Sequence, residues 1–358
     1  MSFRYFTALL CILVPSLASG SDKYRLYKSA HFLGRGDTGI AIADDHDAIF
    51  YNPAGLAQGT GIYKETVLLS PLIEVSSDTK DLIRQISVEG NSDPETLLSH
   101  EGKNQHIGLY DFLGIVLRRA AVGAFVGNQT NILVRKDPDE AGLNMVEANA
   151  YGNQGAAFSI AESFFSSSLM VGGTFKYLRR QSAELSMSLA ESSNMSDQLE
   201  DENNMTQTQG SGADLGLIYR VGTRAPFSLG VHVENVGTTK LTAAEEGSGD
   251  DSLPQMIHAG IALEPGTKYS KFRLLLDYRD ITNEEETTLY KRIHVGSEIV
   301  VGRFLGLSGG LNQGYPTMGL YVNLYFLRFD VGAYSEEVGS RAGARPDKRY
   351  YFKLFAGF

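Results

Sequence analysis

Segments of about ten residues in which apolar and polar residues alternate follow one another along most of the chain. In Lys271–Thr282, for example, Phe272, Leu274, Leu276 and Tyr278 form an apolar face, and Arg273, Asp277 and Arg279 lie on the other. A period of two predicts strands with one apolar and one polar face. We count fourteen such segments: Glu65–Ser76, Gln105–Leu117, Ala120–Lys136, Asn144–Ala161, Ser167–Ser188, Gly210–Val221, Phe227–Val236, Gln255–Glu264, Lys271–Thr282, Leu289–Val301, Phe304–Asn312, Thr317–Phe326, Leu327–Tyr334 and Arg349–Phe358.

The joins between these segments are sorted by length. Joins from an even-numbered to an odd-numbered segment are brief, whereas the opposite ones include Ser77–Asn104, Leu189–Gln209, Gly237–Pro254 and Glu336–Lys348. Short turns at one rim and long loops at the other are typical of a transmembrane β-barrel. Alternation alone would also fit a soluble β-sandwich, but the sorted joins favour the barrel. We therefore predict an all-β fold, a transmembrane antiparallel β-barrel of about 14 strands over residues 63–358.

Composition agrees with a barrel and disfavours two other classes. Apolar residues make up 42% of the chain and charged residues 21%. After the leader no uninterrupted apolar stretch reaches the roughly 18 residues that a membrane-spanning helix needs, which disfavours a helical bundle. The net charge of -10 argues against nucleic acid as a partner, because phosphate binding needs clustered Lys and Arg.

Residues 1–20 have the composition of a secretory signal peptide. A basic residue precedes the apolar run Phe6–Val14, and small residues then lead to a cleavage site predicted after Ala18 or Gly20. The only cysteine of the sequence, Cys11, lies in that apolar run. Large residues precede Cys11, which disfavours a lipoprotein, so we predict a mature chain without thiol or disulfide chemistry.

The stretch from Gly34 to Ala57 differs from the segments that follow it. Its glycines permit tight turns, its acids separate short apolar pieces, and an Asn-Pro pair breaks any strand. We predict that residues 21–62 form a compact plug inside a polar lumen. The residues of this plug motif are Gly34, Gly36, Gly39, Asp44, Asp45, Asn52, Pro53 and Ala54. The three glycines also spell G-x-G-x-x-G, but no strand–helix–strand unit surrounds them, which disfavours a dinucleotide site.

A resemblance follows from this stretch. The acidic pair and the run from Tyr51 to Leu56, YNPAGL, resemble the N-terminal signature of the FadL-type outer-membrane superfamily, including its PorV-like and TraF-like branches. Leu307–Gly339 resembles the closing hairpins of the PorV-like branch. The FadL resemblance implies fourteen strands, a plug that moves, and passive uptake of hydrophobic small molecules such as long-chain fatty acids. The PorV-like resemblance implies a platform for protein secretion or surface attachment.

The last predicted strand, Arg349–Phe358, closes on a C-terminal aromatic residue. This ending resembles the signal by which outer-membrane proteins are recognised for insertion. With the signal peptide, it predicts a multi-pass barrel in the bacterial outer membrane, in contact with lipid. It also predicts the barrel assembly machinery as a partner that contacts the strand ending at Phe358.

The polar faces of the strands supply the candidate lumen residues. Arg273, Arg279, Arg328 and Lys353 are the candidate contacts for a substrate carboxylate, because a guanidinium can bind both carboxylate oxygens. The alternative is a charge network that holds wall and plug together. We further hypothesise that Asp44, Asp45 and Asp47 pair with some of these cations.

No catalytic set stands out in the sequence. We find no G-x-S-x-G elbow and no H-E-x-x-H metal motif among the seven histidines. We therefore predict no enzyme activity, no cofactor and no metal site, although a barrel enzyme built from residues distant in sequence is an alternative. The leading function is a plug-gated uptake channel, a PorV-like platform is second, and a structural or adhesive surface protein is third.

Overall fold

The wall of the molecule is a single antiparallel sheet that closes on itself. The computed structural model describes residues 21–59, 61–79, 98, 101–136, 144–189, 205–223, 225–243, 250–267, 269–302, 304–339 and 343–358, so the predicted signal peptide lies outside the described residues. The strands are β1 (Tyr63–Leu69), β2 (Leu72–Ser76), β3 (Asn104–Leu117), β4 (Ala120–Lys136), β5 (Asn144–Phe164), β6 (Leu169–Ser188), β7 (Met205–Val221), β8 (Phe227–Glu234), β9 (Thr239–Ala243), β10 (Asp251–Leu253), β11 (Met256–Leu263), β12 (Ser270–Tyr278), β13 (Ile293–Val301), β14 (Leu305–Asn312), β15 (Tyr315–Asn323), β16 (Leu327–Glu337) and β17 (Pro346–Gly357). The barrel closes where β17 pairs with both β1 and β2.

Three of the barrel strands are each interrupted once. β1 and β2 are separated at Ser70–Pro71, β8 and β9 at Asn235–Thr238, and β10 and β11 at Pro254 and the residue after it. Proline has no backbone N–H for the ladder, which explains two of the interruptions. The backbone N–H of Ser70 donates instead to the carboxylate of Asp111 at 2.8 Å. If each interrupted pair is counted as one strand, the seventeen strands of the sheet form a barrel of fourteen, as the sequence predicts.

Each of the fourteen predicted segments corresponds to one barrel strand, although several strand ends differ; β12, for example, ends at Tyr278 and not at Thr282, and β7 begins at Met205 and not at Gly210. Leu289–Arg292 was predicted as the start of a strand but forms the short helix α7. In this helix the Nζ atom of Lys291 donates to the carbonyl of Gly339 at 3.1 Å. In addition, β9 and β10 form a hairpin within the predicted long join Gly237–Pro254.

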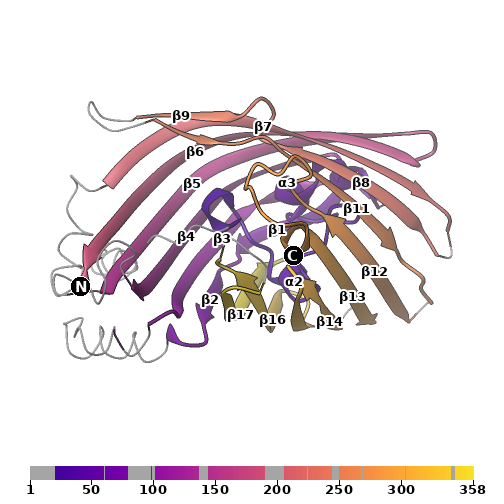
Figure 1. Cartoon of the computed structure of the whole chain (residues 1–358). Helices are drawn as coiled ribbons and strands as arrows, with labels where there is room; N and C mark the ends of the chain where they lie inside the picture. The colour runs from indigo at the N-terminus through magenta and orange to yellow at the C-terminus, as the bar shows by residue number, and fades with distance from the viewer. Residues whose placement is uncertain are drawn as a thin grey trace, which may run out of the picture.

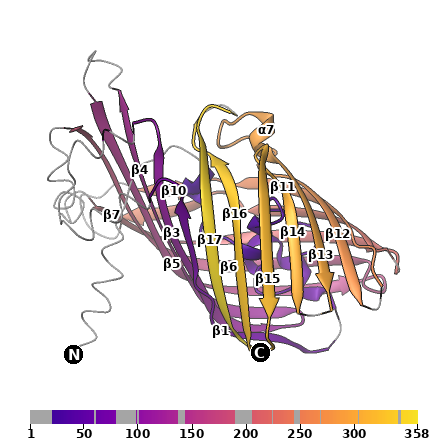
Figure 2. The ribbon, with the colours of Figure 1, turned by 90° about the horizontal axis from the view of Figure 1, so that it is seen from below.

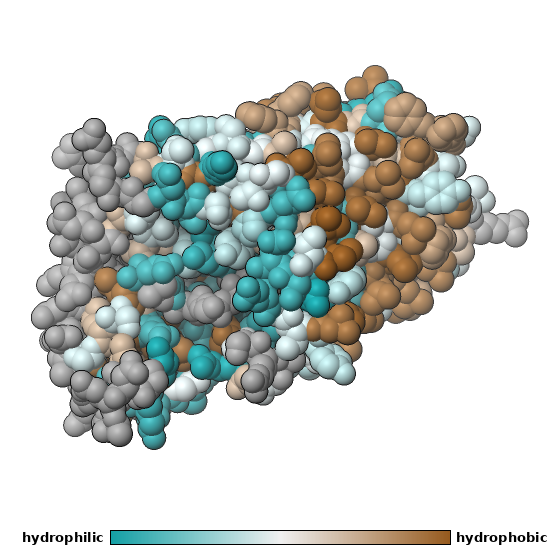
Figure 3. Space-filling model, turned by 45° about the horizontal axis from the view of Figure 1, so that its top comes forward, coloured by the Kyte–Doolittle hydropathy of each residue, from teal (hydrophilic) through white to brown (hydrophobic). Residues whose placement is uncertain are grey.

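Alternation sorts the side chains between the outer surface and the lumen. On β12, Leu274 and Leu276 are 43% and 44% exposed, whereas Asp277 is fully buried. Figure 3 shows apolar residues gathered toward one end of the wall and hydrophilic residues toward the other. The wall therefore has an apolar outer band and a polar interior, the arrangement of a barrel in lipid.

Strands β4 to β7 are longer than the others. β5 has 21 residues and β6 has 20, whereas β13 to β15 have eight or nine. About 9–11 residues suffice for a tilted strand to cross a membrane. This part of the wall is therefore longer than a membrane crossing requires. Figure 2 shows β4 and β5 on the side of the barrel away from β13 and β14.

Residues 21–59, which we call the lumenal segment, lie inside the ring of strands (Figure 1). They form η1 (Ser21–Tyr24), α2 (Ala30–Leu33), α3 (Ala48–Tyr51) and η2 (Pro53–Ala57). Their apolar side chains join lumen-facing residues of the wall, among them Phe112 and Phe125, in one core cluster. None of the described helices is long and apolar enough to span a membrane.

The lumenal segment approaches the wall backbone where the wall carries glycine. A Cβ atom added at Gly216 of β7 would lie 2.0 Å from Oδ1 of Asn52 and 2.9 Å from the backbone nitrogen of Ala54. The Asn52 side chain donates to the carbonyl of Ile40 at 2.8 Å and to the carbonyls of Leu217 and Val231 at 3.3 Å. The Asn-Pro pair is therefore a contact between segment and wall as well as a turn.

We predict that Gly216→Ala displaces residues 52–54 from the wall while the barrel still forms. In a Cys11→Ser background with Ala54→Cys as a reporter, maleimide labelling should be at least about tenfold faster in the Gly216→Ala variant. The control is Gly309→Ala, whose added Cβ would lie 3.6 Å from its nearest neighbour, an ordinary contact. Equal labelling rates in the two variants would contradict the close packing at Gly216.

Candidate functional site

The lumenal segment is held by buried polar clusters that join it to several wall strands. The first is centred on Asp37. Its carboxylate pairs with Arg25 of the same segment and, at 2.9 Å, with Arg279, and it accepts from the Tyr51 hydroxyl at 2.8 Å. Burial alone would raise the pKa of Asp37, but Arg25 and then Arg279 lower it to about 2. Asp37 is therefore ionised at neutral pH and fixes the segment to the end of β12.

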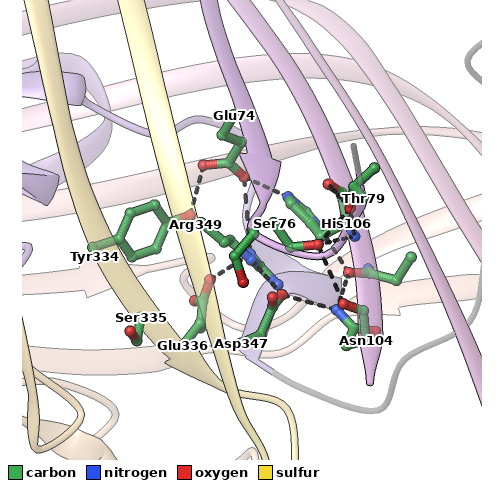
Figure 4. Close-up of polar contacts among 12 residues, drawn as sticks. Glu74, Ser76, Thr79, Asn104, His106, Tyr334, Ser335, Glu336, Asp347 and Arg349 are labelled. Carbon is green, nitrogen blue, oxygen red and sulfur yellow. Dashed lines mark hydrogen bonds and ion pairs between the residues drawn. The ribbon is translucent and has the colours of Figure 1, made fainter. Parts of the chain in front are cut away.

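The second cluster is centred on Glu74 of β2 and is shown in Figure 4. Lys28 of the segment donates to Glu74 Oε1 at 2.9 Å, and His106 Nε2 lies 2.7 Å from the same oxygen. The Tyr334 hydroxyl of β16 donates to the other oxygen at 2.6 Å. Lys28 and Glu74 are both fully buried. One lysine of the segment thus reaches the strands on both sides of the β17–β2 closure.

Arg349 of β17 continues this network along the closure. It donates to Glu336 at 2.6 Å and to Asp347 at 2.7 Å, and Asp347 in turn accepts from Asn104 of β3 at 2.8 Å. Figure 4 shows these side chains converging from β3, β16 and β17. Side-chain bonds therefore supplement the backbone ladder where the first and last parts of the wall meet.

The third cluster is centred on Glu298 of β13. Arg35 of the segment donates to it at 2.9 Å, Arg273 of β12 donates at 2.7 Å, and His31 of α2 contacts its other oxygen. Burial lowers the pKa of His31 to about 4, against the opposing effect of Glu298. His31 is consequently neutral at pH 7, and both guanidinium groups pair with the carboxylate, while Arg273 also pairs with Glu264.

The fourth cluster surrounds Asp47 and His46. Asp47 accepts from the Tyr27 hydroxyl at 2.8 Å and from the Ser29 hydroxyl at 2.5 Å. His46 Nδ1 lies 2.8 Å from Glu65 of β1, and Lys353 Nζ lies 3.2 Å from His46 Nε2. Ligand atoms of Asp45, His46 and Asp47 lie within 4.8 Å of one another, a spacing that suits a metal ion. The Lys353 ammonium already supplies a positive charge beside His46, so we assign no metal to this cluster.

The residues of the predicted plug motif all lie in the lumenal segment but make different contacts. Gly36 has a φ of 75°, a conformation that glycine adopts readily, and its N–H donates to Thr317 at 2.9 Å. Gly34 and Gly39 lie against Tyr351 and Phe32, and Pro53 lies against Gly172 of the wall. The Ala54 N–H donates to Asn52 at 3.2 Å, which caps η2.

The hypothesis that the acids of the motif pair with the candidate cations is wrong. Among the described residues, none of Asp44, Asp45 and Asp47 forms an ion pair with Arg273, Arg279, Arg328 or Lys353. Asp44 accepts through its backbone carbonyl from Lys64, and Asp45 accepts from the backbone of Asp47 at 2.9 Å. Within the lumenal segment, the acid that pairs with a candidate cation is Asp37, which meets Arg279 just after β12.

The four candidate cations all lie on the lumenal side and all have protein partners. Arg273 pairs with Glu298 and Glu264, Arg279 pairs with Asp37, and Arg328 pairs with Asp330 at 2.5 Å. Lys353 lies 3.1 Å from the Tyr27 hydroxyl. These contacts support the alternative of a charge network, and a role in substrate contact stays a prediction.

A cavity remains between the lumenal segment and the wall. It offers about 90 Å³ to the centres of water-sized molecules. Since one water needs about 10–15 Å³ on this measure, it has room for about six to nine waters. Tyr24, Phe50 and Tyr51 line it from the segment, and Glu234 and Arg279 line it from the wall. Of the four candidate cations, Arg279 is the one in this lining.

Sequence reasoning missed several residues at the centres of these clusters. Lys28, Asp37 and Glu74 were not singled out, although each is buried and multiply bonded. The sequence could have indicated that Asp37 and Glu74 are buried, since each is a charged residue between apolar or small neighbours. It could not have indicated their partners, because some of these lie more than two hundred residues away in the chain.

Comparisons with known proteins identify the fold. No family model and no curated protein matches the chain. Among solved structures, the toluene transporter TbuX of Ralstonia pickettii is similar over 94% of this chain and 99% of that one, with 11% identity and a TM-score of 0.52. A mutant of the monoaromatic hydrocarbon channel TodX is similar over 93% and 98%, with 9% identity and a TM-score of 0.51. Such low identities establish a shared fold and leave the substrate open.

We predict that Lys28→Met lowers the free energy of unfolding by about 3 kcal/mol, because it leaves the buried Glu74 carboxylate without its ammonium partner. Thermal or denaturant unfolding of the refolded barrel measures this. The double variant Lys28→Met, Glu74→Gln should lose less than the sum of the single variants. The control is Lys103→Met, which removes a surface pair with Asp78 and should cost under about 1 kcal/mol. A Lys28 effect as small as the control would contradict the buried pair.

We predict that acid releases the lumenal segment through Asp37. Its folded pKa of about 2 lies below its ordinary value of 3.8, so ionised Asp37 stabilises the docked segment above about pH 4 and this contribution is lost as pH falls toward 2. The part of the single-channel conductance that depends on Asp37, taken as the difference between the unmodified protein and Asp37→Asn, should be constant from pH 7 to 5 and change between pH 4 and 2. Asp37→Asn should raise conductance at pH 7 and flatten the acid rise, whereas the surface control Asp78→Asn should do neither. An unchanged acid rise in Asp37→Asn would sink this assignment.

Proposed function

Because the chain has the fold of the FadL-type outer-membrane transporters, we propose that it is an outer-membrane channel for passive uptake of hydrophobic small molecules. In this proposal the lumenal segment is a movable plug. The observation that supports it most is the combination of a closed, apolar-banded barrel with a lumen occupied by a separate segment. An open polar pore would need no such segment.

The packing of the lumen implies that transport requires the segment to move. Most residues from Leu26 to Ala57 are buried, and the cavity lined by Phe50 and Arg279 is too small for a long acyl chain. The segment is joined to the wall by side-chain ion pairs, hydrogen bonds and apolar contacts, all of which are reversible. Displacing it breaks several of them together, so we expect a gate with a closed resting state.

A hydrophobic substrate class is supported by the apolar part of the lumen. Phe50 of the segment contacts the rings of Phe112 and Phe125 of the wall at centroid distances of 6.0 and 5.3 Å. If the segment moves, these wall rings offer an apolar path. Long-chain fatty acids are one candidate, and Arg279 is the candidate cation best placed to meet their carboxylate, since it lines the cavity.

The proposed location is the bacterial outer membrane, reached after cleavage of the signal peptide. The final strand β17 ends beside β1, where the Tyr63 hydroxyl donates to the carbonyl of Phe358. Phe358 itself is 57% exposed. We propose that this exposed aromatic end is what the barrel assembly machinery recognises.

A PorV-like platform for secretion or attachment is the alternative function. It needs a partner surface in the long loops, and the central parts of several of these loops lie outside the described residues. The contacts within the lumen favour the channel, because a platform needs no buried charge pairs between segment and wall.

Uptake of a labelled long-chain fatty acid by a host without its own porter tests the proposal. The intact protein should increase uptake over the empty host, and deletion of residues 31–57 should change the rate because it removes the plug. Both proteins must first be shown to reach the outer membrane. No uptake by a correctly inserted intact barrel would remove long-chain fatty acids as substrates and favour the platform.

A further inference from the structure

Basic and acidic side chains line the cavity beside the lumenal segment in equal number, five of each. Most are already paired. Lys176 donates to Asp214 at 2.8 Å, and Arg279 pairs with Asp37. A ligand with a net charge would therefore add a charge that the lining does not need.

Two carboxylates of the lining keep acceptor capacity. Glu234 is 23% exposed, and its Oε2 atom lies 3.3 Å from His258. Its Oε1 atom lies 4.0 Å from Lys176, which is too far for a hydrogen bond. Glu285 is half-buried, and no hydrogen bond joins its carboxylate to any described residue. Burial and then Asp280 raise the pKa of Glu285 to about 7. The cavity thus presents oxygens that lack donors.

The same cavity also presents donors. Arg25 and Arg279 are partly exposed, and each guanidinium carries more N–H groups than its bonds to Asp37 use. Other unpaired nitrogens nearby do not count as binding groups. Nε of Arg279, Nε of Arg292 and Nε2 of His232 have no hydrogen-bond partner, but they are buried out of reach of solvent.

One side of the cavity is aromatic. Tyr27 and Phe50 stack with their centroids 4.4 Å apart, and both line the cavity together with Tyr24. Phe50 and Tyr24 are only half-buried, so their rings can contact a ligand. The space for about six to nine waters suits a molecule with a single ring.

We propose that this cavity binds small neutral aromatic molecules that carry a hydroxyl group, with the ring against Tyr24 and Phe50 and the hydroxyl donating to Glu234. A hydroxyl both donates and accepts, so it can use the carboxylate and the guanidinium groups together. An ammonium group can only donate, an ionised carboxylate can only accept, and a hydrocarbon does neither. The inference rests on the proposed function, of which it narrows the substrate class.

Four ligands of matched size test the proposal: benzyl alcohol, toluene, benzylammonium and benzoate. Equilibrium dialysis of each labelled ligand against protein in nanodiscs, with empty nanodiscs subtracted, gives its affinity. Benzyl alcohol should bind at least about fivefold more tightly than the other three. If toluene binds equally well, or if either charged ligand binds more tightly, the proposal is wrong.

Variants at Glu234 locate the site. Glu234→Leu should weaken benzyl alcohol binding about tenfold or more, as expected for losing a hydrogen bond to a charged group, and should leave toluene binding unchanged. Glu234→Gln keeps a hydrogen-bond acceptor, so it should weaken benzyl alcohol binding less than Glu234→Leu does. The control is Glu184→Leu, a partly exposed carboxylate outside the lining, and it should have no effect. Unchanged affinity in Glu234→Leu would overturn the assignment, and if that variant does not fold, the four-ligand comparison still decides.

Nitrogen-15 labelling of the histidine side chains gives an independent NMR readout. The sequence has seven histidines, so each imidazole signal can be assigned. Benzyl alcohol should shift the His258 signal, since His258 contacts Glu234, and should leave that of His106 in place. Failure of this inference differs from failure of the proposed function. Fatty-acid uptake without benzyl alcohol binding would remove the inference alone, whereas binding without any uptake would remove the channel and keep the site.

Discussion

The pairing of buried charges inside the lumen is the constraint on which the rest of the structure depends. A barrel in lipid turns its polar side chains inward, where water is scarce once another segment fills the space. Unpaired charges there would cost several kcal/mol each. The lumenal segment supplies the missing partners: Lys28 for Glu74, Arg35 for Glu298, and Asp37 for Arg279. Wall and segment are therefore electrostatically complementary, and each needs the other to be fully paired.

The same complementarity explains how the segment could act as a gate. Its pairs reach β2, β12 and β13, which lie in different parts of the wall. Leaving the lumen would break these pairs together, and each broken pair would leave a charge that water must then solvate. Because Asp37 and Arg279 line the cavity, a displacement there would break the Asp37 cluster first and leave the pairs of Lys28 and Arg35 in place.

The lumen combines two environments that suit different parts of an amphipathic molecule. Toward β3 to β7, the rings and aliphatic side chains around Phe50 form an apolar cluster. Toward β8, β11 and β12, the cavity is half polar and has basic and acidic side chains in equal number. An uncharged molecule with one polar group would find both environments next to each other.

The sequence by itself determined the barrel, its strand count and the face of each strand, because a period of two in hydrophobicity and the sorted join lengths are local properties of the chain. It also set Gly34–Ala57 apart from the strands that follow. It did not determine the partners. Asp44, Asp45 and Asp47 were expected to pair with wall cations, yet Asp37 does so, and Lys28 and Glu74 passed unnoticed. Lys28 meets Tyr334 from three hundred residues away, and such contacts depend on the register of the closed sheet and on the path of the segment inside it. Those are set only when the whole barrel closes, so the tertiary structure alone decided which charges meet and where a cavity remains.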